Sequence, residues 1–213
     1  MSLRPEFVRA LELLGEMEKP VVVEVGSHQG DGVLYMRAAC PSAKIYAIEA
    51  DPGNYTKLMA RTVGKADCRN LVIGSVSGRA RINCYRGKNS RRSSVYPEVG
   101  KISRARGGVK TVPSMMLDDF CSEPFVYLQP DFIRFDCYGG EYEIFWHGIP
   151  EAVKGAKMVL LTMHCKTGLF DNHIYVHLRK RIRKQMKGHG FRVEMQTVKK
   201  PHKHQFVLWV KED

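Results

Sequence analysis

The segment of residues 21–51 constrains the fold of this chain more than any other. It opens with a β-branched run over residues 21–25 and a glycine-rich turn over residues 26–32. A helical stretch then leads to a second apolar run over residues 44–48, and the acid Glu49 follows directly. This order of strand, glycine turn, helix, strand and acid is typical of a nucleotide site at the carboxyl edge of a parallel sheet.

The spacing of the glycines separates two classes of nucleotide ligand. A dinucleotide turn has the pattern G-x-G-x-x-G, whereas the glycines here are Gly26, Gly30 and Gly32, so no frame supplies that pattern. The acid Glu24 lies inside the first strand, where it would repel a pyrophosphate but can hold the ammonium of an amino-acid group. An NAD-dependent dehydrogenase is therefore disfavoured.

The acid after the second strand fits a nucleoside without phosphates. The carboxylate of Glu49 can accept hydrogen bonds from ribose hydroxyls, while Glu24 can hold an ammonium. Ammonium and ribose together describe S-adenosylmethionine better than NAD, and the alternative is a glycine turn in some other α/β protein. The residues expected around this donor are Glu24, Gly26, Ser27, His28, Gly30, Glu49, Ala50 and Ser75.

The other apolar segments extend this unit into a single α/β domain over residues 1–213. Further strands are predicted over residues 70–73, 81–85, 130–136 and 157–163, with a hairpin formed by residues 191–198 and 205–210. Helices are predicted over residues 5–17 of an N-terminal segment (1–19), and over 55–63, 142–153 and 173–188. The order predicts a Rossmann-like, mostly parallel seven-stranded sheet with an antiparallel C-terminal edge hairpin and helices on both faces.

Basic residues are in excess. The formal charge of +12 attracts anions such as nucleic acid or an acidic membrane surface. Basic side chains gather from Arg86 to Arg106, within a glycine- and serine-rich loop over residues 86–110, and from Arg179 to Lys184 in the last helix. The loop is either a solvated segment or a lid that clamps an anionic substrate.

The cysteines and the hydropathy pattern indicate a cytoplasmic protein. The six cysteines are scattered without a C-x-x-C pair, which argues against a zinc site and against a disulfide scaffold. No apolar run reaches the length of a membrane span, and no signal peptide precedes Pro5.

Both halves of the chain carry an ordered set of short motifs. They are E-x-G-x-x-x-G from Glu24, E-A-D-P from Glu49, the serines Ser93 and Ser94, L-D-D from Leu117, I-R-F-D-C-Y-G-G-E from Ile133, and L-L-T-M-H ending at His164. As a set, they resemble the FkbM-type family of S-adenosylmethionine-dependent methyltransferases over residues 21–164. The resemblance implies that S-adenosylmethionine is the methyl donor and S-adenosylhomocysteine the product.

Four positions depart from the family's usual pattern. Arg134 stands in place of a lysine, and Tyr138 in place of a glutamate. Ser75 replaces an acid that would meet the adenine amino group, and Thr162 replaces the glutamate of a later strand. The resemblance therefore implies intact ribose recognition with a changed acceptor side, whose expected residues are Ser93, Ser94, Arg134 and Tyr138.

Three side chains that follow two of the strands are candidates for the chemistry. If the acceptor is a hydroxyl, a base must take its proton, and His164 has the suitable pKa. Asp136 can orient either the acceptor or the donor, and Glu141 either joins this catalytic group or caps the helix that follows it. The same three side chains can hold a metal, but no spacing demands one, and we expect none.

Three functions remain open from the sequence. The first is O-methylation of a hydroxyl on a sugar, a lipid or a small metabolite. The second is methylation of RNA or another polyanion along the basic loop and helix, although Arg134 and Tyr138 break the lysine-aspartate-lysine-glutamate set of ribose methyltransferases. The third is a catalytically weak protein that binds a nucleotide or a partner, as the residues at positions 75, 138 and 162 suggest.

Overall fold

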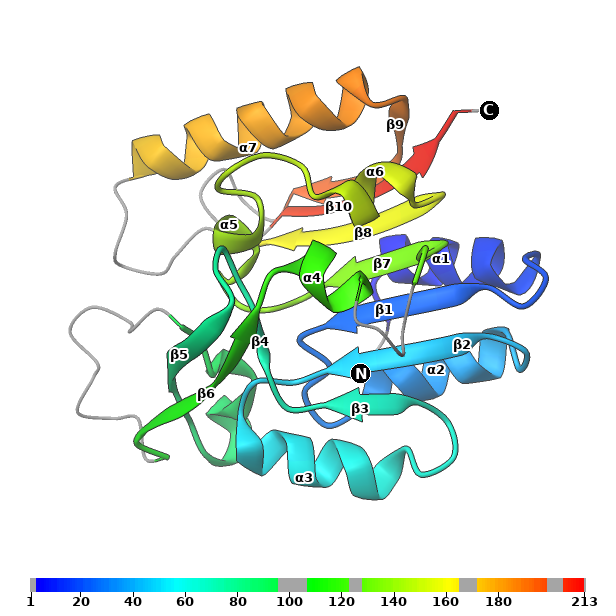
Figure 1. Cartoon of the computed structure of the whole chain (residues 1–213). Coiled ribbons are helices and arrows are strands. Elements are labelled where there is room, and N and C mark those ends of the chain that lie inside the picture. Colours follow the sequence, from blue (N-terminus) through cyan, green and yellow to red (C-terminus); the bar gives the residue numbers. More distant parts are fainter. Residues whose placement is uncertain (1–2, 96–106, 123–127, 165–171, 199–204, 213) are drawn as a thin grey trace.

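In the computed structural model of the chain, a seven-stranded sheet forms the centre of the molecule (Figure 1). The structure describes residues 3–95, 107–122, 128–164, 172–198 and 205–212. The strand order is β3-β2-β1-β7-β8-β10-β9. The strands are β1 (Val21–Val25), β2 (Lys44–Ile48), β3 (Asp67–Arg69), β7 (Phe132–Phe135), β8 (Met158–Met163), β9 (Phe191–Val198) and β10 (Gln205–Lys211).

One strand of this sheet runs against the others. β1 pairs in parallel with β2 and β7, and β7 with β8. β10 is antiparallel to both β8 and β9, which confirms the C-terminal hairpin and leaves β9 as the edge strand. The expected Rossmann-like, mostly parallel sheet is thus confirmed, and the carboxyl ends of β1, β2, β7 and β8 lie at the same edge of it.

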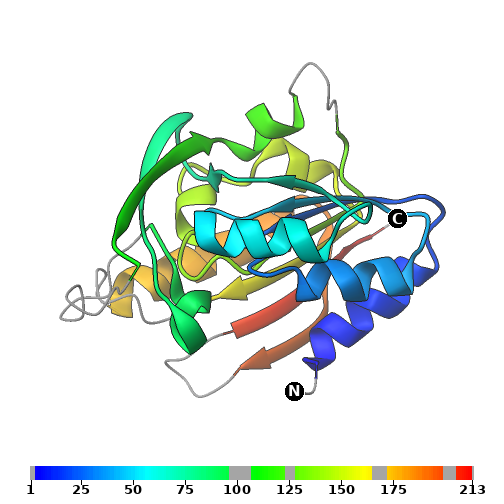
Figure 2. The same ribbon diagram turned by 90° about the horizontal axis from the view of Figure 1, so that it is seen from below.

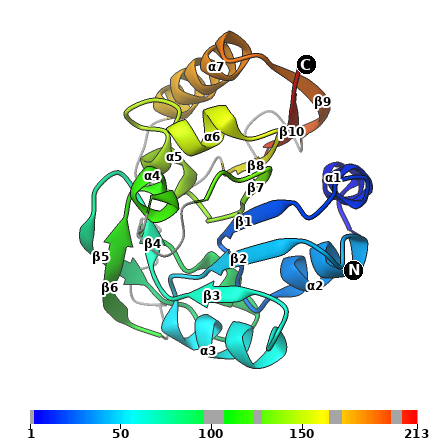
Figure 3. The same ribbon diagram turned by 45° about the vertical axis from the view of Figure 1, so that its right-hand side comes forward.

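Helices cover both faces of the sheet (Figure 3). One face carries α1 (Pro5–Gly15), α2 (Asp31–Ala39) and α3 (Pro52–Arg61), and the other carries α4 (Leu117–Cys121), α5 (Glu141–Ile144), α6 (Glu151–Gly155) and α7 (Asn172–Gly188). Both faces of β1 are apolar and buried under helices. Val22 packs into one core, Val23 and Val25 pack into the other, and none of the three is more than 3% exposed.

Helix α1 brings its first turn to the carboxyl edge of the sheet (Figure 2). Pro5 begins the helix, where a missing N–H costs nothing, and the apolar side chains of Phe7 and Leu14 are buried on one face. Because only residues 16–20 separate the end of α1 from β1, the helix runs antiparallel to that strand. Its N-terminus therefore lies where β1 ends.

A second, smaller sheet adjoins the carboxyl ends of β2 and β3, with the order β4-β6-β5. It consists of β4 (Val72–Ile73), β5 (Gly78–Asn83) and β6 (Val109–Met115). The strand predicted over residues 70–73 forms as β4, but it lies in this second sheet, and β3 takes the third position in the main sheet. The side-chain amide of Asn70 donates to the carbonyl oxygens of Glu49 (2.8 Å) and Ala50 (3.1 Å), so the chain leaves the main sheet at this residue.

The predicted helix over residues 142–153 is interrupted. It consists of the short helices α5 and α6, separated by Gly148 at a φ of 138° and by Pro150, neither of which suits a helix interior. Phe145, the residue after α5, is fully buried. α5 ends before Trp146, whose residue surface is 43% exposed.

Candidate functional site

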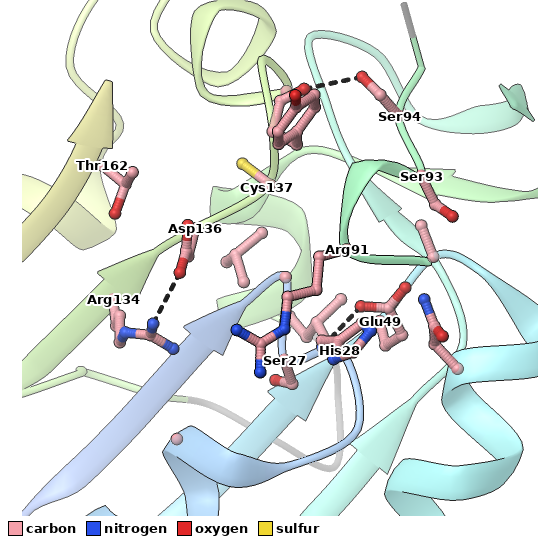
Figure 4. Close-up of a pocket in the computed structure, with 18 of the residues that line it drawn as sticks. Ser27, His28, Glu49, Arg91, Ser93, Ser94, Arg134, Asp136, Cys137 and Thr162 are labelled. Atoms are coloured by element: carbon pink, nitrogen blue, oxygen red, sulfur yellow. Dashed lines mark hydrogen bonds and ion pairs between the residues drawn. The ribbon is translucent and has the colours of Figure 1, made fainter. Parts of the chain in front are cut away.

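A cavity of about 490 Å³ opens at the carboxyl edge of the main sheet (Figure 4). Its volume falls in the range of about 300–1,000 Å³ that is usual for small-molecule sites. The turns after the strands, the first turn of α1 and the 3-10 helix η1 (Gly87–Arg92) enclose it. The sequence-predicted residues that line it are Gly26, Ser27, His28, Glu49, Ala50, Ser93, Ser94, Arg134, Asp136, Tyr138 and His164.

The turn after β1 needs glycine at its first position. Gly26 has a φ of 87°, and a Cβ on it would lie 2.5 Å from the carbonyl oxygen of Asp136. The backbone N–H groups of Gly26 and Ser27 both donate to the carbonyl oxygen of Ile48, at 2.9 and 3.0 Å. The turn is therefore held between β2 and β7, and it presents Ser27 and His28 to the cavity.

Glu49 ends β2 with its carboxylate at the cavity wall, where the residue is only 7% exposed. Oε2 accepts from the backbone N–H of His28 at 2.8 Å, and Oε1 from that of Asp51 at 2.9 Å. Burial raises the pKa of Glu49 to about 7, although both hydrogen bonds favour the charged form. Each carboxylate oxygen has a second lone pair for a ligand hydroxyl.

Gly30 serves packing rather than ligand contact, which corrects its expected place in the donor site. It caps α2 at a φ of 87° and does not line the cavity. A Cβ there would lie 2.7 Å from Cγ2 of Thr62 and 3.0 Å from Cδ1 of Leu58, both beside α3. The glycine thus lets α3 pack against the turn.

The expected contact between Glu24 and a donor ammonium is also corrected. Glu24 has no exposed surface, does not line the cavity, and forms an ion pair with Arg134 on the neighbouring strand β7. A Cβ on Gly32 would collide with this carboxylate, so the glycine makes room for the pair. Glu24 therefore contacts Arg134 and not the cavity.

Arg134 joins the buried acid to an acid of the cavity. Its second nitrogen, Nη2, lies 2.8 Å from Oδ2 of Asp136, whose side chain is 31% exposed (Figure 4). Burial would raise the pKa of Asp136, but Arg134 and then His164 hold it below its usual value. Asp136 is therefore the ionised carboxylate that faces the cavity beside the Gly26 turn.

His164 follows β8 and is held by Glu141. Its Nδ1 lies 3.0 Å from Oε1 of Glu141, and its Nε2 lies 3.7 Å from Oδ1 of Asp136. Burial would lower the pKa of His164, but the carboxylates of Glu141 and Asp136 outweigh it and raise the pKa above the usual value. Glu141 is fully buried and does not line the cavity, so among the described residues it meets the site through His164.

Glu141 also holds the turn before α5. It lies in the first turn of that helix, and its Oε2 accepts from the backbone N–H of Gly139 at 2.7 Å. One carboxylate oxygen therefore contacts His164 and the other contacts the turn.

Two non-glycine residues at the cavity have a left-handed backbone. His28 has a φ of 52° and Tyr138 a φ of 46°, conformations that cost energy and concentrate at functional sites. The ring of Tyr138 lies 4.8 Å from the ring of His164, centroid to centroid. Tyr138 thus forms the wall beside the candidate base.

The described beginning of the basic loop crosses the cavity as a strap, here defined as residues 90–94. The hydroxyl of Ser90 lies 2.8 Å from Nε2 of His28, and the hydroxyl of Ser93 donates to Oδ2 of Asp51 at 2.6 Å. The hydroxyl of Ser94 donates to the carbonyl oxygen of Tyr138 at 2.8 Å. The strap is thereby bonded to the turns after β1, β2 and β7.

Ser75 does not reach the cavity, which corrects its expected adenine contact. Its hydroxyl donates to Oε2 of Glu143 at 2.7 Å, on the first turn of α5. The cavity wall in this region is apolar and consists of Leu71, Val72, Ile73 and Ile82. A purine there would be held by packing against these side chains.

Several lining residues carried no sequence signal. Arg4, Glu6 and Phe7 come from the first turn of α1, and Phe206 comes from β10. They lie close to residues far away in the chain only because the sheet order brings α1, β8 and β10 together. Arg91 was predicted only as part of a basic segment, and it points into the cavity in Figure 4.

A family model for the methyltransferase FkbM domain matches residues 24–194. The chain belongs to the FkbM methyltransferase family. It is therefore an S-adenosylmethionine-dependent methyltransferase, as the ordered motifs indicated. No curated protein matches the chain in sequence.

Solved structures agree with this family at the level of the fold. The chain is similar to an O-methyltransferase from Bacillus cereus in complex with SAH (TM-score 0.57, 12% identity, covering 99% of this chain and 83% of that one). It is also similar to a putative rRNA methylase from Clostridium thermocellum, with a TM-score of 0.57 and 6% identity, covering 100% of this chain and 99% of that one. A third similar structure is the fibrillarin pre-rRNA processing protein of Methanococcus jannaschii, with a TM-score of 0.53 and 12% identity, covering 98% of this chain and 76% of that one. At these identities they establish the Rossmann-like methyltransferase fold alone.

The cavity of this FkbM methyltransferase fits the donor of its family. Gly26 and Ser27 line it at the end of β1, and Glu49 presents a carboxylate at the end of β2. Ala50 and Ile73 line an apolar section beside it, suited to an adenine ring. Among the described residues, no group of three His, Cys, Asp or Glu side chains is arranged to hold a metal ion.

Of the basic side chains predicted to bind a polyanion, some are buried or bonded within the protein, and others lie outside the described residues. Residues 96–106 of the loop lie outside the described part of the chain. On α7, Arg179 is 8% exposed, and Arg181 donates to the carbonyl oxygens of Phe145 and Trp146. Over the described residues, no helix is long and apolar enough to span a membrane.

Proposed function

We propose that this methyltransferase transfers the donor methyl group to a hydroxyl of a small acceptor, such as a sugar, a lipid or another metabolite. The observation that carries the proposal is the 3.7 Å separation between Nε2 of His164 and Oδ1 of Asp136 at the cavity wall. A hydroxyl oxygen about 2.8 Å from Nε2 can donate its one proton to that nitrogen. The carboxylate of Asp136 then lies beside the imidazole, where it stabilises the charge that His164 acquires.

The donor contacts proposed here rest on the same cavity. Glu49 accepts hydrogen bonds from the ribose hydroxyls, while Ser27, His28 and Ala50 surround the nucleoside. Asp136 is the ionised carboxylate closest to the Gly26 turn, so it replaces Glu24 as the partner of the donor ammonium. Arg134 keeps Asp136 ionised and fixes its direction.

S-adenosylmethionine, when bound, supplies a methyl carbon on a sulfonium that leaves as the thioether of S-adenosylhomocysteine. On the protein side, the acceptor hydroxyl loses its proton to Nε2 of His164 as the new bond from oxygen to carbon forms. Glu141 holds the ring through Nδ1 and stabilises the charge that His164 acquires. The strap supports the transfer by limiting the access of water to the cavity.

Two measurements test the proposal. Calorimetry with S-adenosylmethionine, S-adenosylhomocysteine and NAD is expected to give binding of the first two and none of the third. Formation of S-adenosylhomocysteine over a panel of hydroxylated acceptors is expected to fall about 100-fold or more in His164→Gln while donor affinity is unchanged. Equal turnover in this variant excludes His164 as the base.

A polyanionic acceptor such as RNA is the second candidate, favoured by one observation. The exposed Trp146 lies beside α7, where Lys180 and Lys184 are exposed, and a base can stack on such a ring while lysines meet phosphates. RNA binding measured across a salt series tests it, because phosphate contacts give a steep salt slope. A flat slope, or no loss of affinity in Trp146→Ala, rules it out.

A further inference from the structure

The cavity extends beyond the contacts assigned to the donor. It continues over β8 and β10 under the first turn of α1, where Arg4, Glu6, Leu160, Thr162 and Phe206 line it. The nucleoside half lies instead over β1 and β2, around Glu49. This extension is therefore the space that remains for the acceptor.

Glu6 is the unusual residue of this extension. It is 1% exposed, it lines the cavity, and neither of its carboxylate oxygens has a hydrogen-bond partner among the described residues. Burying an unpaired carboxylate is costly, so its neighbours or a ligand must compensate for it. A ligand that donates hydrogen bonds, such as one with adjacent hydroxyls, would satisfy both oxygens.

Arg4, the N-cap of α1 two residues before Glu6, supplies the opposite charge. Its guanidinium carbon lies 3.4 Å from the centroid of the Phe206 ring, and none of the described carboxylates forms an ion pair with it. A guanidinium that stacks on an aromatic ring keeps its N–H edge free for a planar anion. Arg4 lines the same cavity as Asp136 and His164.

We propose that the acceptor is an acidic sugar: Arg4 binds its carboxylate or phosphate group, and Glu6 accepts hydrogen bonds from hydroxyls beside that group. This inference rests on the methyl transfer to a hydroxyl proposed above. An anion without hydroxyl groups would be repelled by the carboxylate of Glu6 and would donate no hydrogen bond to it. A neutral sugar would provide no anionic group for Arg4. A ligand with both an acid and neighbouring hydroxyls satisfies both residues, while a further hydroxyl faces His164 and Asp136.

Binding of three probes tests the proposal. Glucuronate, glucose 6-phosphate and glucose are titrated into the full chain by calorimetry and ligand-observed NMR, with and without S-adenosylhomocysteine. At least one acidic sugar is expected to bind about 10-fold tighter than glucose, because a charge-assisted bidentate contact to Arg4 is added. The carboxylate and phosphate probes distinguish which acid the site prefers.

Two variants separate the roles of the charged residues. Arg4→Gln is expected to abolish the advantage of the acidic sugars while leaving glucose unchanged. Glu6→Gln, which keeps the shape of the side chain, is expected to weaken all three probes about 5-fold. Arg192→Gln is the control, since this exposed guanidinium lies at the start of β9, away from the carboxyl edge.

The outcomes decide between the two proposals. Acidic sugars that bind no tighter than glucose, or an unchanged preference in Arg4→Gln, overturn the acidic-sugar site and leave methyl transfer standing. Failure to bind S-adenosylhomocysteine contradicts the methyl-transfer proposal instead. In that case, the series without S-adenosylhomocysteine still decides whether Arg4 and Glu6 form the site.

Discussion

Glu141 and His164 are joined twice. Oε1 of Glu141 accepts a hydrogen bond from the backbone N–H of His164 at 2.6 Å and lies 3.0 Å from Nδ1 of the ring. The pair fixes both the chain after β8 and the direction of the imidazole, so Nε2 is turned toward Asp136. Because this carboxylate is buried and bonded to the imidazole, it raises the pKa of His164.

The first prediction concerns that ionisation. Titration of the His164 ring by NMR is expected to give a pKa above 6.5, because Glu141 and Asp136 outweigh the effect of burial. In Glu141→Gln, the largest of the effects that oppose burial is removed, so the pKa is expected to fall below that of the wild type. A pKa that does not move in this variant contradicts the positioning role of Glu141.

The rate of methyl transfer is expected to follow the same titration. A base must be unprotonated, so kcat/KM is expected to rise with pH through a midpoint above 6.5, and this limb should be absent in His164→Gln. His177→Gln, a change at an exposed position of α7, is the control and should keep the profile of the wild type.

A second prediction follows from the carboxylate of Glu49. Its pKa of about 7 means that the group is largely protonated at pH 6 and largely ionised at pH 8. The ionised form accepts more hydrogen bonds from ribose, so the affinity for adenosine is expected to rise about 5-fold over this range. Adenosine is the suitable probe because it has no ammonium or carboxylate of its own.

Variants at this position provide the control. In Glu49→Gln, adenosine should bind more weakly and with an affinity that no longer depends on pH between 6 and 8. Glu49→Ala is expected to reduce donor affinity far more than it reduces the free energy of unfolding. A pH profile that persists in Glu49→Gln would assign the titration to another group.

The sequence predicted the central unit because its signals were local. The alternation of apolar runs and the Gly26 turn lie within one βαβ unit, so their spacing alone defined the strand end that carries Glu49. The same reasoning failed where a distant partner decides the structure. Glu24 reads as a ligand-facing acid, but Arg134, 110 positions later, neutralises it and Gly32 leaves room for both.

The acceptor side was beyond sequence reasoning for a similar reason. Residues 5–17 were correctly predicted as a helix, but nothing local indicates that α1 presents Glu6 and Arg4 to the cavity. Their position depends on the place of the antiparallel strand β10 in the sheet, because the guanidinium of Arg4 stacks on the ring of Phe206 from that strand. The departure of the chain from the main sheet at Asn70 likewise depends on side-chain bonds to the end of β2.

The third prediction concerns the Gly26 turn. In Gly26→Ala, the alanine would have an unfavourable φ of 87°. Its Cβ would also lie 2.5 Å from the carbonyl oxygen of Asp136, the residue that follows β7. We expect a loss of about 2–4 kcal/mol in the free energy of unfolding and the loss of donor binding. Gly64→Ala is the matched control, since at a φ of 68° its Cβ would meet no heavy atom within 4 Å among the described residues.

That control should lose only about 1–2 kcal/mol, the ordinary cost of a left-handed residue, and should bind the donor normally. Urea unfolding and calorimetry measure the two quantities separately. Equal losses in both variants would mean that the close approach of the turn to β7 is unimportant.

The fourth prediction tests the ion pair inside the sheet. Arg134→Met leaves the carboxylate of Glu24 buried without a counter-charge, so the variant is expected to lose about 3–5 kcal/mol of stability. The double variant Glu24→Met with Arg134→Met removes both charges and should recover most of that loss. Donor binding should nevertheless stay weak in the double variant, because Asp136 has lost the guanidinium that orients it.

The fifth prediction concerns the strap over the cavity. Ser93 donates to the carboxylate of Asp51 while its oxygen accepts from the backbone N–H of Tyr85 at 3.1 Å, so one hydroxyl ties the strap to two segments. A hydrogen bond to a charged group contributes about 1.5–3 kcal/mol, so Ser93→Ala is expected to accelerate donor dissociation at least about 10-fold. Stopped-flow displacement measures this rate, and hydrogen exchange should show reduced protection over residues 90–94. Ser122→Ala, which removes a hydroxyl bonded to Asp118 on α4, is the control that should leave the rate unchanged; a similar acceleration there would mean that the strap does not retain the donor.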